Sequence, residues 1–121
     1  MIKNTNYRIL TFLWAILILV LSITPGDYVP KVEFEILSPD TLAHFVFYMV
    51  LIYLRLKWRK VNLTSYLNLS LILLTTISYG YGIEVIQGGF IPGRYYDIYD
   101  VAFNSIGAVV GVGVYFLFKK K

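Results

Sequence analysis

The chain has 121 residues, of which 58% are hydrophobic and 15% are charged, and its mean hydropathy is +0.67. Soluble domains average about 45–50% apolar and about 25% charged residues, and a short chain cannot bury so large an apolar excess, so lipid must solvate much of it. The net charge of +4 comes from basic clusters beside apolar segments, which indicates membrane topology rather than nucleic-acid binding, and the lack of cysteine excludes disulfides and thiolate metal sites.

The first apolar segment runs from Ile9 to Ile23 and follows Lys3 and Arg8. A cleaved signal peptide starts in the same way, but no Ala-x-Ala-like cleavage site follows this segment. We therefore interpret it as a retained helix over about residues 7–23. Pro25 and Gly26 end it, because proline lacks an amide donor and glycine favours turns.

Asp40 begins the second predicted helix, over about residues 40–56, where an acid suits the positive end of the helix dipole. A basic cluster with an interfacial tryptophan follows, which is typical of the cytoplasmic end of a membrane helix. This cluster comprises Arg55, Lys57, Trp58, Arg59 and Lys60.

The third predicted helix covers about residues 64–87 and the fourth about residues 96–118. Between them, Gly88 to Gly93 predicts a tight turn. The fourth helix carries Gly107 and Gly111, a GxxxG pattern that lets helix backbones approach closely in lipid. Each segment approaches the roughly 20 residues that are needed to span a bilayer.

The charges divide cleanly when these four segments are drawn as spanning helices. Two basic residues precede the first segment, four follow the second and three follow the fourth, which puts nine of eleven on the side of the termini. All seven acidic residues can lie on the opposite side. By the positive-inside rule, the sequence predicts one all-α domain over residues 1–121, a four-helix membrane bundle with both termini in the cytoplasm.

The polar residues of the last three helices are expected to meet at the outer boundary. Their spacings of three and four put them on shared helix faces, and Gly107 and Gly111 continue the last stripe, so that it must face into the bundle. Ionisable groups at this depth cost several kcal/mol in hydrocarbon and need partners. We expect Arg94 to pair with Asp97, Asp100 or Glu84. The candidate site comprises Asp40, His44, Glu84, Gln87, Arg94, Asp97, Asp100 and Asn104.

Each of these groups has a structural and a functional interpretation. Asp40 and His44 are either a helix cap beside a hydrogen-bonded histidine or a carboxylate-oriented general base, and they are the catalytic candidates. Arg94 either holds the turn through its neighbouring acids or binds a substrate headgroup. Asn104 is interpreted as an interhelical hydrogen-bond link. One histidine and several carboxylates could hold a hard divalent cation through oxygen ligands, but no HExxH or cysteine pattern supports a catalytic zinc, and no metal or other cofactor is predicted.

Two motifs closely resemble those of the VanZ-like family of small bacterial membrane proteins. They are Asp40-x3-His44-Phe45-x2-Tyr48 and Glu84-x2-Gln87-x2-Phe90-x-Pro92-Gly93-Arg94-x2-Asp97-x2-Asp100-x3-Asn104-x2-Gly107-x3-Gly111. Family members often carry lysine where this chain has Thr41 and an acid where it has Ile83, which removes one cation and one carboxylate here. The resemblance implies a multi-pass protein of the bacterial cytoplasmic membrane, in a family whose namesake is linked to teicoplanin resistance.

Three functions are compatible with this pattern. The first is a membrane protein that binds an envelope lipid, glycolipid or partner at its outer face and modulates lipoglycopeptide susceptibility. The second is a small intramembrane enzyme acting on a lipid-linked phosphate or sugar. The third, a transporter, is disfavoured because the polar groups stop in the outer third of the helices. Of these, the first is our interpretation of the sequence. The expected partners are membrane lipids or a lipid-linked ligand, no nucleic-acid partner is expected, and the sequence does not indicate an oligomeric state.

Overall fold

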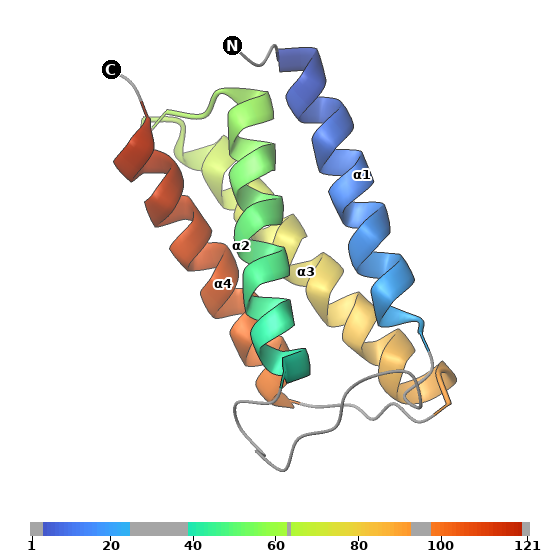
Figure 1. The fold of residues 1–121 in the computed structure, drawn as a ribbon. Helices are drawn as coiled ribbons and strands as arrows, with labels where there is room; N and C mark the ends of the chain where they lie inside the picture. The colour runs from blue at the N-terminus through green and yellow to red at the C-terminus, as the bar shows by residue number, and fades with distance from the viewer. Residues whose placement is uncertain (1–3, 25–38, 63, 93–97, 120–121) are drawn as a thin grey trace.

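The computed structural model describes residues 4–24, 39–62, 64–92 and 98–119. Within them the chain forms four helices, α1 (Asn4–Ser22), α2 (Pro39–Arg59), α3 (Tyr66–Phe90) and α4 (Ile98–Phe118), so the prediction of an all-α fold is confirmed. The helices run alternately up and down, and the beginning of α1 and the end of α4 lie at the same end (Figure 1). We call that end, where Arg55, Arg59 and Lys119 lie, the basic end, and the opposite one, where Glu84 and Asp100 lie, the acidic end.

Two helices, α2 and α3, continue beyond the ends that the sequence predicted. Helix α2 continues through Lys57 to Arg59, and α3 continues through Gly88 and Gly89 to Phe90, so the predicted turn at Gly88 is wrong. In lipid every backbone amide must find a partner, and this requirement outweighs the roughly 1 kcal/mol that glycine costs a helix. The helix ends at Ile91, whose backbone is extended (φ −102°, ψ 120°), because Pro92 disfavours a helical residue before it.

The exterior of the bundle is suited to lipid. Three segments, Thr41–Arg59, Tyr66–Phe90 and Ile98–Phe118, are long and apolar enough to cross a membrane, whereas α1 offers the shorter apolar stretch Asn6–Ser22. Large apolar side chains face outward on all four helices. The structure therefore supports a membrane protein with at least three spanning helices, and the span predicted for α1 stays a prediction.

Glycines determine how closely α4 approaches α2. A Cβ atom added at Gly111 would lie 2.6 Å from the Met49 carbonyl oxygen and 3.2 Å from the Met49 Cα. At Gly107 the added atom would collide with the Phe45 carbonyl group. The predicted GxxxG surface is thus a contact between α4 and the backbone of α2, and it brings the polar residues of these helices together.

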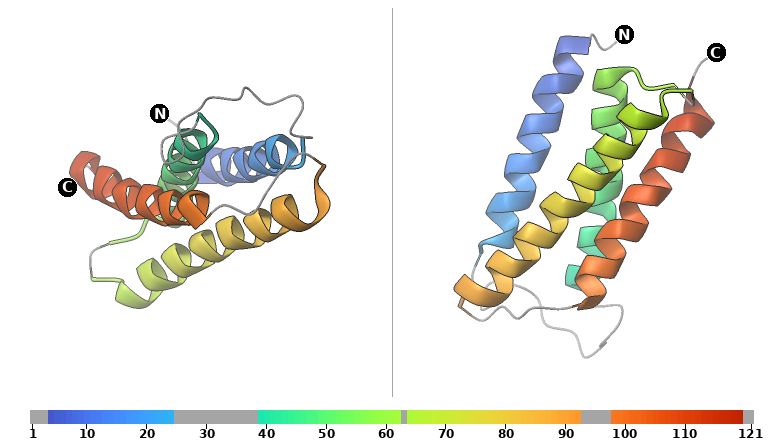
Figure 2. Two further views of the ribbon diagram at one scale, coloured as in Figure 1. Left: turned by 90° about the horizontal axis from the view of Figure 1, so that it is seen from below. Right: turned by 180° about the vertical axis from the view of Figure 1, so that it is seen from behind.

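Helix α3 crosses the bundle obliquely, starting beside α4 at the basic end and finishing beside α1 at the acidic end (Figure 2). Near its start, Ile72 joins a core with Ile52, Ala108 and Tyr115. Near its finish, the Gln87 amide donates a hydrogen bond of 3.0 Å to the Ser22 carbonyl oxygen of α1. This tilt separates α1 from α3 at the basic end.

Candidate functional site

Three ionisable side chains from three helices meet inside the acidic end. His44 of α2, Glu84 of α3 and Asp100 of α4 each present one potential ligand atom, and these atoms lie within 4.8 Å of one another. None of the three residues is more than 2% exposed. The sequence predicted that these helices turn their polar stripes inward, and the structure brings these three members of the predicted site together.

His44 is oriented by Asn104. The imidazole Nδ1 lies 2.8 Å from the Asn104 side-chain oxygen, across the contact between α2 and α4. Because an amide oxygen only accepts hydrogen bonds, Nδ1 is the donor and carries a proton. The other nitrogen, Nε2, then faces the Asp100 carboxylate at 4.0 Å. This hydrogen bond is the interhelical link predicted for Asn104, and it leaves Nε2 on the side of the ring that faces the carboxylate.

Asp100 is held from its other side by Thr41. The Thr41 hydroxyl donates a buried hydrogen bond of 2.7 Å to Asp100 Oδ1. Thr41 is the position at which the family often has lysine, and here a neutral donor takes the place of a cation. Hydrogen bonds to charged groups contribute about 1.5–3 kcal/mol, so this contact stabilises the carboxylate and fixes its orientation toward His44.

Gly80 allows α3 to reach this group. A Cβ atom added at Gly80 would lie 2.8 Å from the Asn104 side-chain nitrogen. Glu84 follows one turn later on the same face of α3. A larger residue at position 80 would therefore move Asn104 or push Glu84 away from His44.

An aromatic wall closes the cluster on the side of the apolar core. The Tyr48 ring stacks on the His44 ring, with centroids 6.1 Å apart, and is tilted against Tyr79 at 6.3 Å. Tyr48 is fully buried, and among the described residues its hydroxyl has no hydrogen-bond partner. The Asn104 side-chain nitrogen also has none. The site thus offers two buried donors that a ligand can use.

Gln87 lies apart from the His44 cluster. It is buried, but its amide donates to Ser22 at the end of α1, as described above. The last carbonyl groups of a helix have no partner within that helix, so Gln87 caps α1 and ties it to α3. The structure gives Gln87 this structural role, whereas the sequence analysis grouped it with the binding residues.

The other three predicted site residues lie outside the described part of the chain, either wholly or in their side chains. Asp40 lies in the first turn of α2, but its side chain is outside the described residues, as are Arg94 and Asp97 altogether. The predicted pairing of Arg94 with a neighbouring acid therefore stays a prediction.

The cluster is chemically able to hold a cation. One imidazole nitrogen and two carboxylates suit a divalent ion of the zinc or manganese kind, and Asn104 supplies the hydrogen bond that such histidine ligands need on their second nitrogen. The sequence analysis predicted no metal ligands. Within the described residues, this is the group in which a metal could bind.

The sequence analysis missed Arg55 as an interior residue. It assigned Arg55 to the basic cluster at the cytoplasmic end of the second helix, but the guanidinium turns toward α3. There Nη1 donates to the Ile72 carbonyl oxygen at 3.0 Å and to the hydroxyls of Thr75 and Thr76 at 2.7 Å each. The two adjacent threonines in an otherwise apolar run were the available signal.

A helical membrane protein with a buried acid–base cluster between its last three helices is the class that the fold and site define. The model of the VanZ/LLP1 family matches residues 7–119 of the 121-residue chain, and the chain belongs to this family. The resemblance inferred from the two motifs is thereby confirmed. No curated protein sequence and no solved structure matches the chain.

Proposed function

We propose that this protein sits in the bacterial cytoplasmic membrane with four spans, both termini in the cytoplasm and the acidic end at the outer face. The distribution of basic residues supports this orientation, because nine of eleven lie before or in the first turns of α1, in or just after the last turns of α2, or after α4. The length of α1 is compatible with a short span, since flanking residues such as Arg8 can extend to the headgroups.

The function that the site supports best is binding of the polar head of an envelope lipid or glycolipid at the His44 cluster. The observation that carries this proposal is the meeting of His44, Glu84 and Asp100 within 4.8 Å in a nearly sealed interior. Each such group costs several kcal/mol in a membrane, and intramembrane ionisable residues generally mark a ligand or ion pathway. The Tyr48 hydroxyl and the Asn104 side-chain nitrogen, which have no hydrogen-bond partner among the described residues, add donors for a phosphate or sugar.

The cellular effect we propose is altered access of lipoglycopeptides of the teicoplanin type to the outer leaflet. Family membership supports this effect, and a lipid-linked ligand at the outer face would lie where such antibiotics act. Strains that carry variants of the cluster should therefore differ from wild type in teicoplanin susceptibility.

A second candidate is a small intramembrane enzyme that acts on a lipid-linked phosphate or sugar. The observation that favours it is the orientation of the His44 ring. Its Nδ1 is hydrogen-bonded to the Asn104 side-chain oxygen, while Nε2 faces the Asp100 carboxylate at 4.0 Å. This is the arrangement of a positioned general base, in which a carboxylate stabilises the imidazolium that forms. Under this function, the bound lipid is a substrate.

The two functions separate in an experiment on near-isosteric variants. The protein is purified in mild detergent after incubation with a bacterial total lipid extract, and retained and converted lipids are measured by mass spectrometry. Binding predicts that Glu84→Gln and Asp100→Asn lose a specifically retained lipid while their melting stays close to that of Ser78→Ala, an exposed control on α3. Retention equal to wild type in both variants contradicts the binding function.

For the enzyme, the informative variant is His44→Gln. It should abolish any change in lipid mass while leaving the lipid bound, because glutamine preserves a donor to Asn104 but cannot accept a proton. A variant that still converts lipid at the wild-type rate would exclude His44 as the base.

A further inference from the structure

Two pockets meet in the half of the bundle nearer the basic end. The first, of 220 Å³, is the more polar of the two and lies between α2 and α3, with Arg55, Arg59, Asn68 and Thr75 in its walls; we call it the polar pocket. The second, of 350 Å³, lies where α3 leans away from α1, and Phe12, Ala15, Leu51 and Tyr79 give it an apolar lining. Both are also lined by Arg55, Trp58 and Thr75, so the two pockets adjoin at these residues, and we call the pair the groove.

The positive charge of Arg55 is not neutralised by an acid within the described part of the chain. Its hydrogen bonds go to one carbonyl and two hydroxyls, and no described carboxylate forms an ion pair with it. Glu84 follows Thr76 by eight residues on α3, which is about 12 Å along the helix axis. Neutral acceptors orient a guanidinium, but they do not cancel its charge in a poorly solvated groove.

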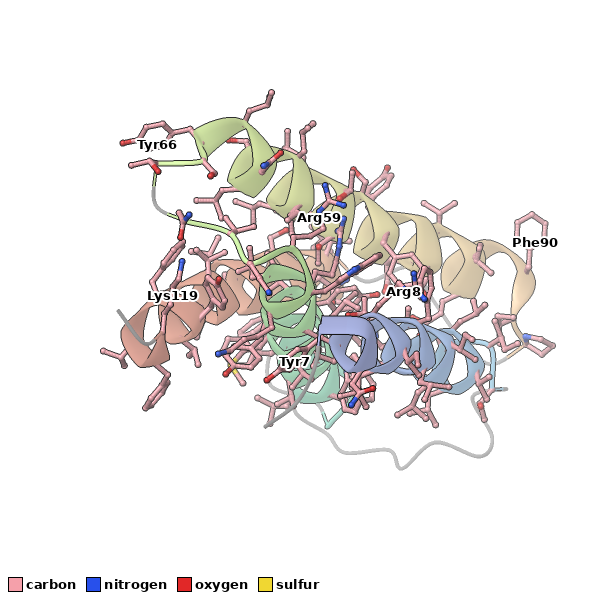
Figure 3. All side chains as sticks on the ribbon, turned by 90° about the horizontal axis from the view of Figure 1, so that it is seen from above. Tyr7, Arg8, Arg59, Tyr66, Phe90 and Lys119 are labelled. Carbon is pink, nitrogen blue, oxygen red and sulfur yellow. The ribbon has the colours of Figure 1, made fainter. Side chains whose placement is uncertain are left out.

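The donors of Arg55 are also only partly used. All three of its hydrogen bonds come from Nη1, whereas a guanidinium carries five N–H groups on three nitrogens. Arg59 lies one turn later on the same face of α2 and lines the same polar pocket. Figure 3 views the bundle from this end, and Arg59 lies on the side of α2 that faces α3. Two guanidinium groups one turn apart form a ready anion site.

We infer that this groove binds a phospholipid with an anionic headgroup, drawn from the leaflet that borders the basic end. The phosphate lies in the polar pocket between Arg55 and Arg59, since arginine binds phosphate through two parallel hydrogen bonds. An acyl chain follows the apolar pocket past Phe12 and Leu51. Trp58 stands at the junction, where an amphipathic ring suits the boundary between head and chain.

The joined pockets favour an amphiphile over a free anion. Inorganic phosphate would fill only the polar part and leave the apolar part empty, whereas a lipid fills both. The outer surfaces of α1 and α3 that lead into the groove are also apolar, with Phe12 57% exposed and Leu71 51% exposed. The groove shares Tyr79 with the aromatic wall of the His44 cluster but none of the ionisable residues of that cluster. Variants of Arg55 and Arg59 therefore test the groove, and variants of His44, Glu84 and Asp100 test the proposed function.

The test measures how strongly the groove prefers an anionic lipid to a zwitterionic one. In a Trp14→Phe background, Trp58 is the sole tryptophan, because the chain has two. The full chain is reconstituted in vesicles of phosphatidylcholine that contain increasing fractions of phosphatidylglycerol with brominated acyl chains, and quenching of Trp58 reports contact with the labelled lipid. Vesicles with brominated phosphatidylcholine give the reference, so the ratio of the two is the preference for the anionic lipid.

Arg55→Gln removes the charge while keeping amide donors for the threonines. We expect it to lower the preference about tenfold, the effect of losing one charge-assisted hydrogen bond. Arg8→Gln is the matched control, because it removes one arginine from the basic end at a residue that lines neither pocket, and it should change the preference little. If Arg55→Gln is too unstable to reconstitute, the more exposed Arg59→Gln provides the same measurement.

Three results would overturn the inference. The first is an unchanged preference in both pocket variants. The second is an equal loss in Arg8→Gln, which would assign the effect to diffuse surface charge. The third is complete competition by millimolar inorganic phosphate, which would assign the pocket to a soluble anion instead of a lipid.

Discussion

Replacing Gly107 by alanine should destabilise the bundle and loosen the candidate site together. The new Cβ atom would lie 3.0 Å from the Phe45 carbonyl carbon and 3.1 Å from the Phe45 Cα, and closer still to the carbonyl oxygen. Ordinary carbon contacts need about 3.5–4.0 Å, so α4 must move away from α2 by roughly half an ångström or more. Backbone atoms cannot rotate aside as a side chain can, and such overpacking typically costs about 1–3 kcal/mol.

The control for this variant is Gly113→Ala on the same helix. A Cβ atom at Gly113 would meet nothing within 4 Å, yet alanine there gains the same helix propensity of up to about 1 kcal/mol. The difference between the two variants therefore isolates the clash. We expect Gly107→Ala to unfold at lower denaturant concentration in detergent micelles, while Gly113→Ala is neutral or stabilising.

The same displacement should reach His44, because its 2.8 Å contact with Asn104 bridges the two helices one turn away. Lipid retention should therefore fall in Gly107→Ala and be unchanged in Gly113→Ala. If Gly107→Ala proves as stable as Gly113→Ala, the close α2–α4 contact described here is wrong.

Two further predictions test the site and the topology. Thr41→Val keeps the side-chain shape but removes the donor to Asp100, so it should lower the free energy of unfolding by about 1.5–3 kcal/mol. Thr24→Val removes a hydrogen bond that is exposed, from just beyond α1 to the Val20 carbonyl oxygen, and should have little effect. Equal stability of the two variants would contradict the buried contact. The chain has no cysteine, so Phe90→Cys and Asn62→Cys each introduce a single thiol at the acidic and basic ends. In intact cells an impermeant maleimide should label only Phe90→Cys, and labelling of Asn62→Cys before permeabilisation would reverse the proposed orientation.

At the site, the sequence predicted which residues share a helix face, but not which side chains on different helices form hydrogen bonds. The spacing of Asp100, Asn104 and Gly107 was sufficient to predict an inward polar stripe on α4, because one helix determines which of its residues share a face. It was insufficient to show that Asn104 bonds His44 while Gln87 turns to Ser22, since the first contact depends on the close approach of α4 to α2 and the second on the tilt of α3. Arg55 was missed for a related reason, because a basic residue near a helix end can extend to water or fold inward with equal ease.

The amino-acid sequence by itself determined the membrane class, the helical fold and the polar character of one end of the bundle. These features follow from hydropathy and charge, which act on each segment separately through lipid and water. Only the tertiary structure decided which polar groups touch and where a groove remains. That outcome depends on how closely Gly107 and Gly111 bring α4 to α2 and on the oblique path of α3 across them, and it arises from contacts between segments that no single segment encodes.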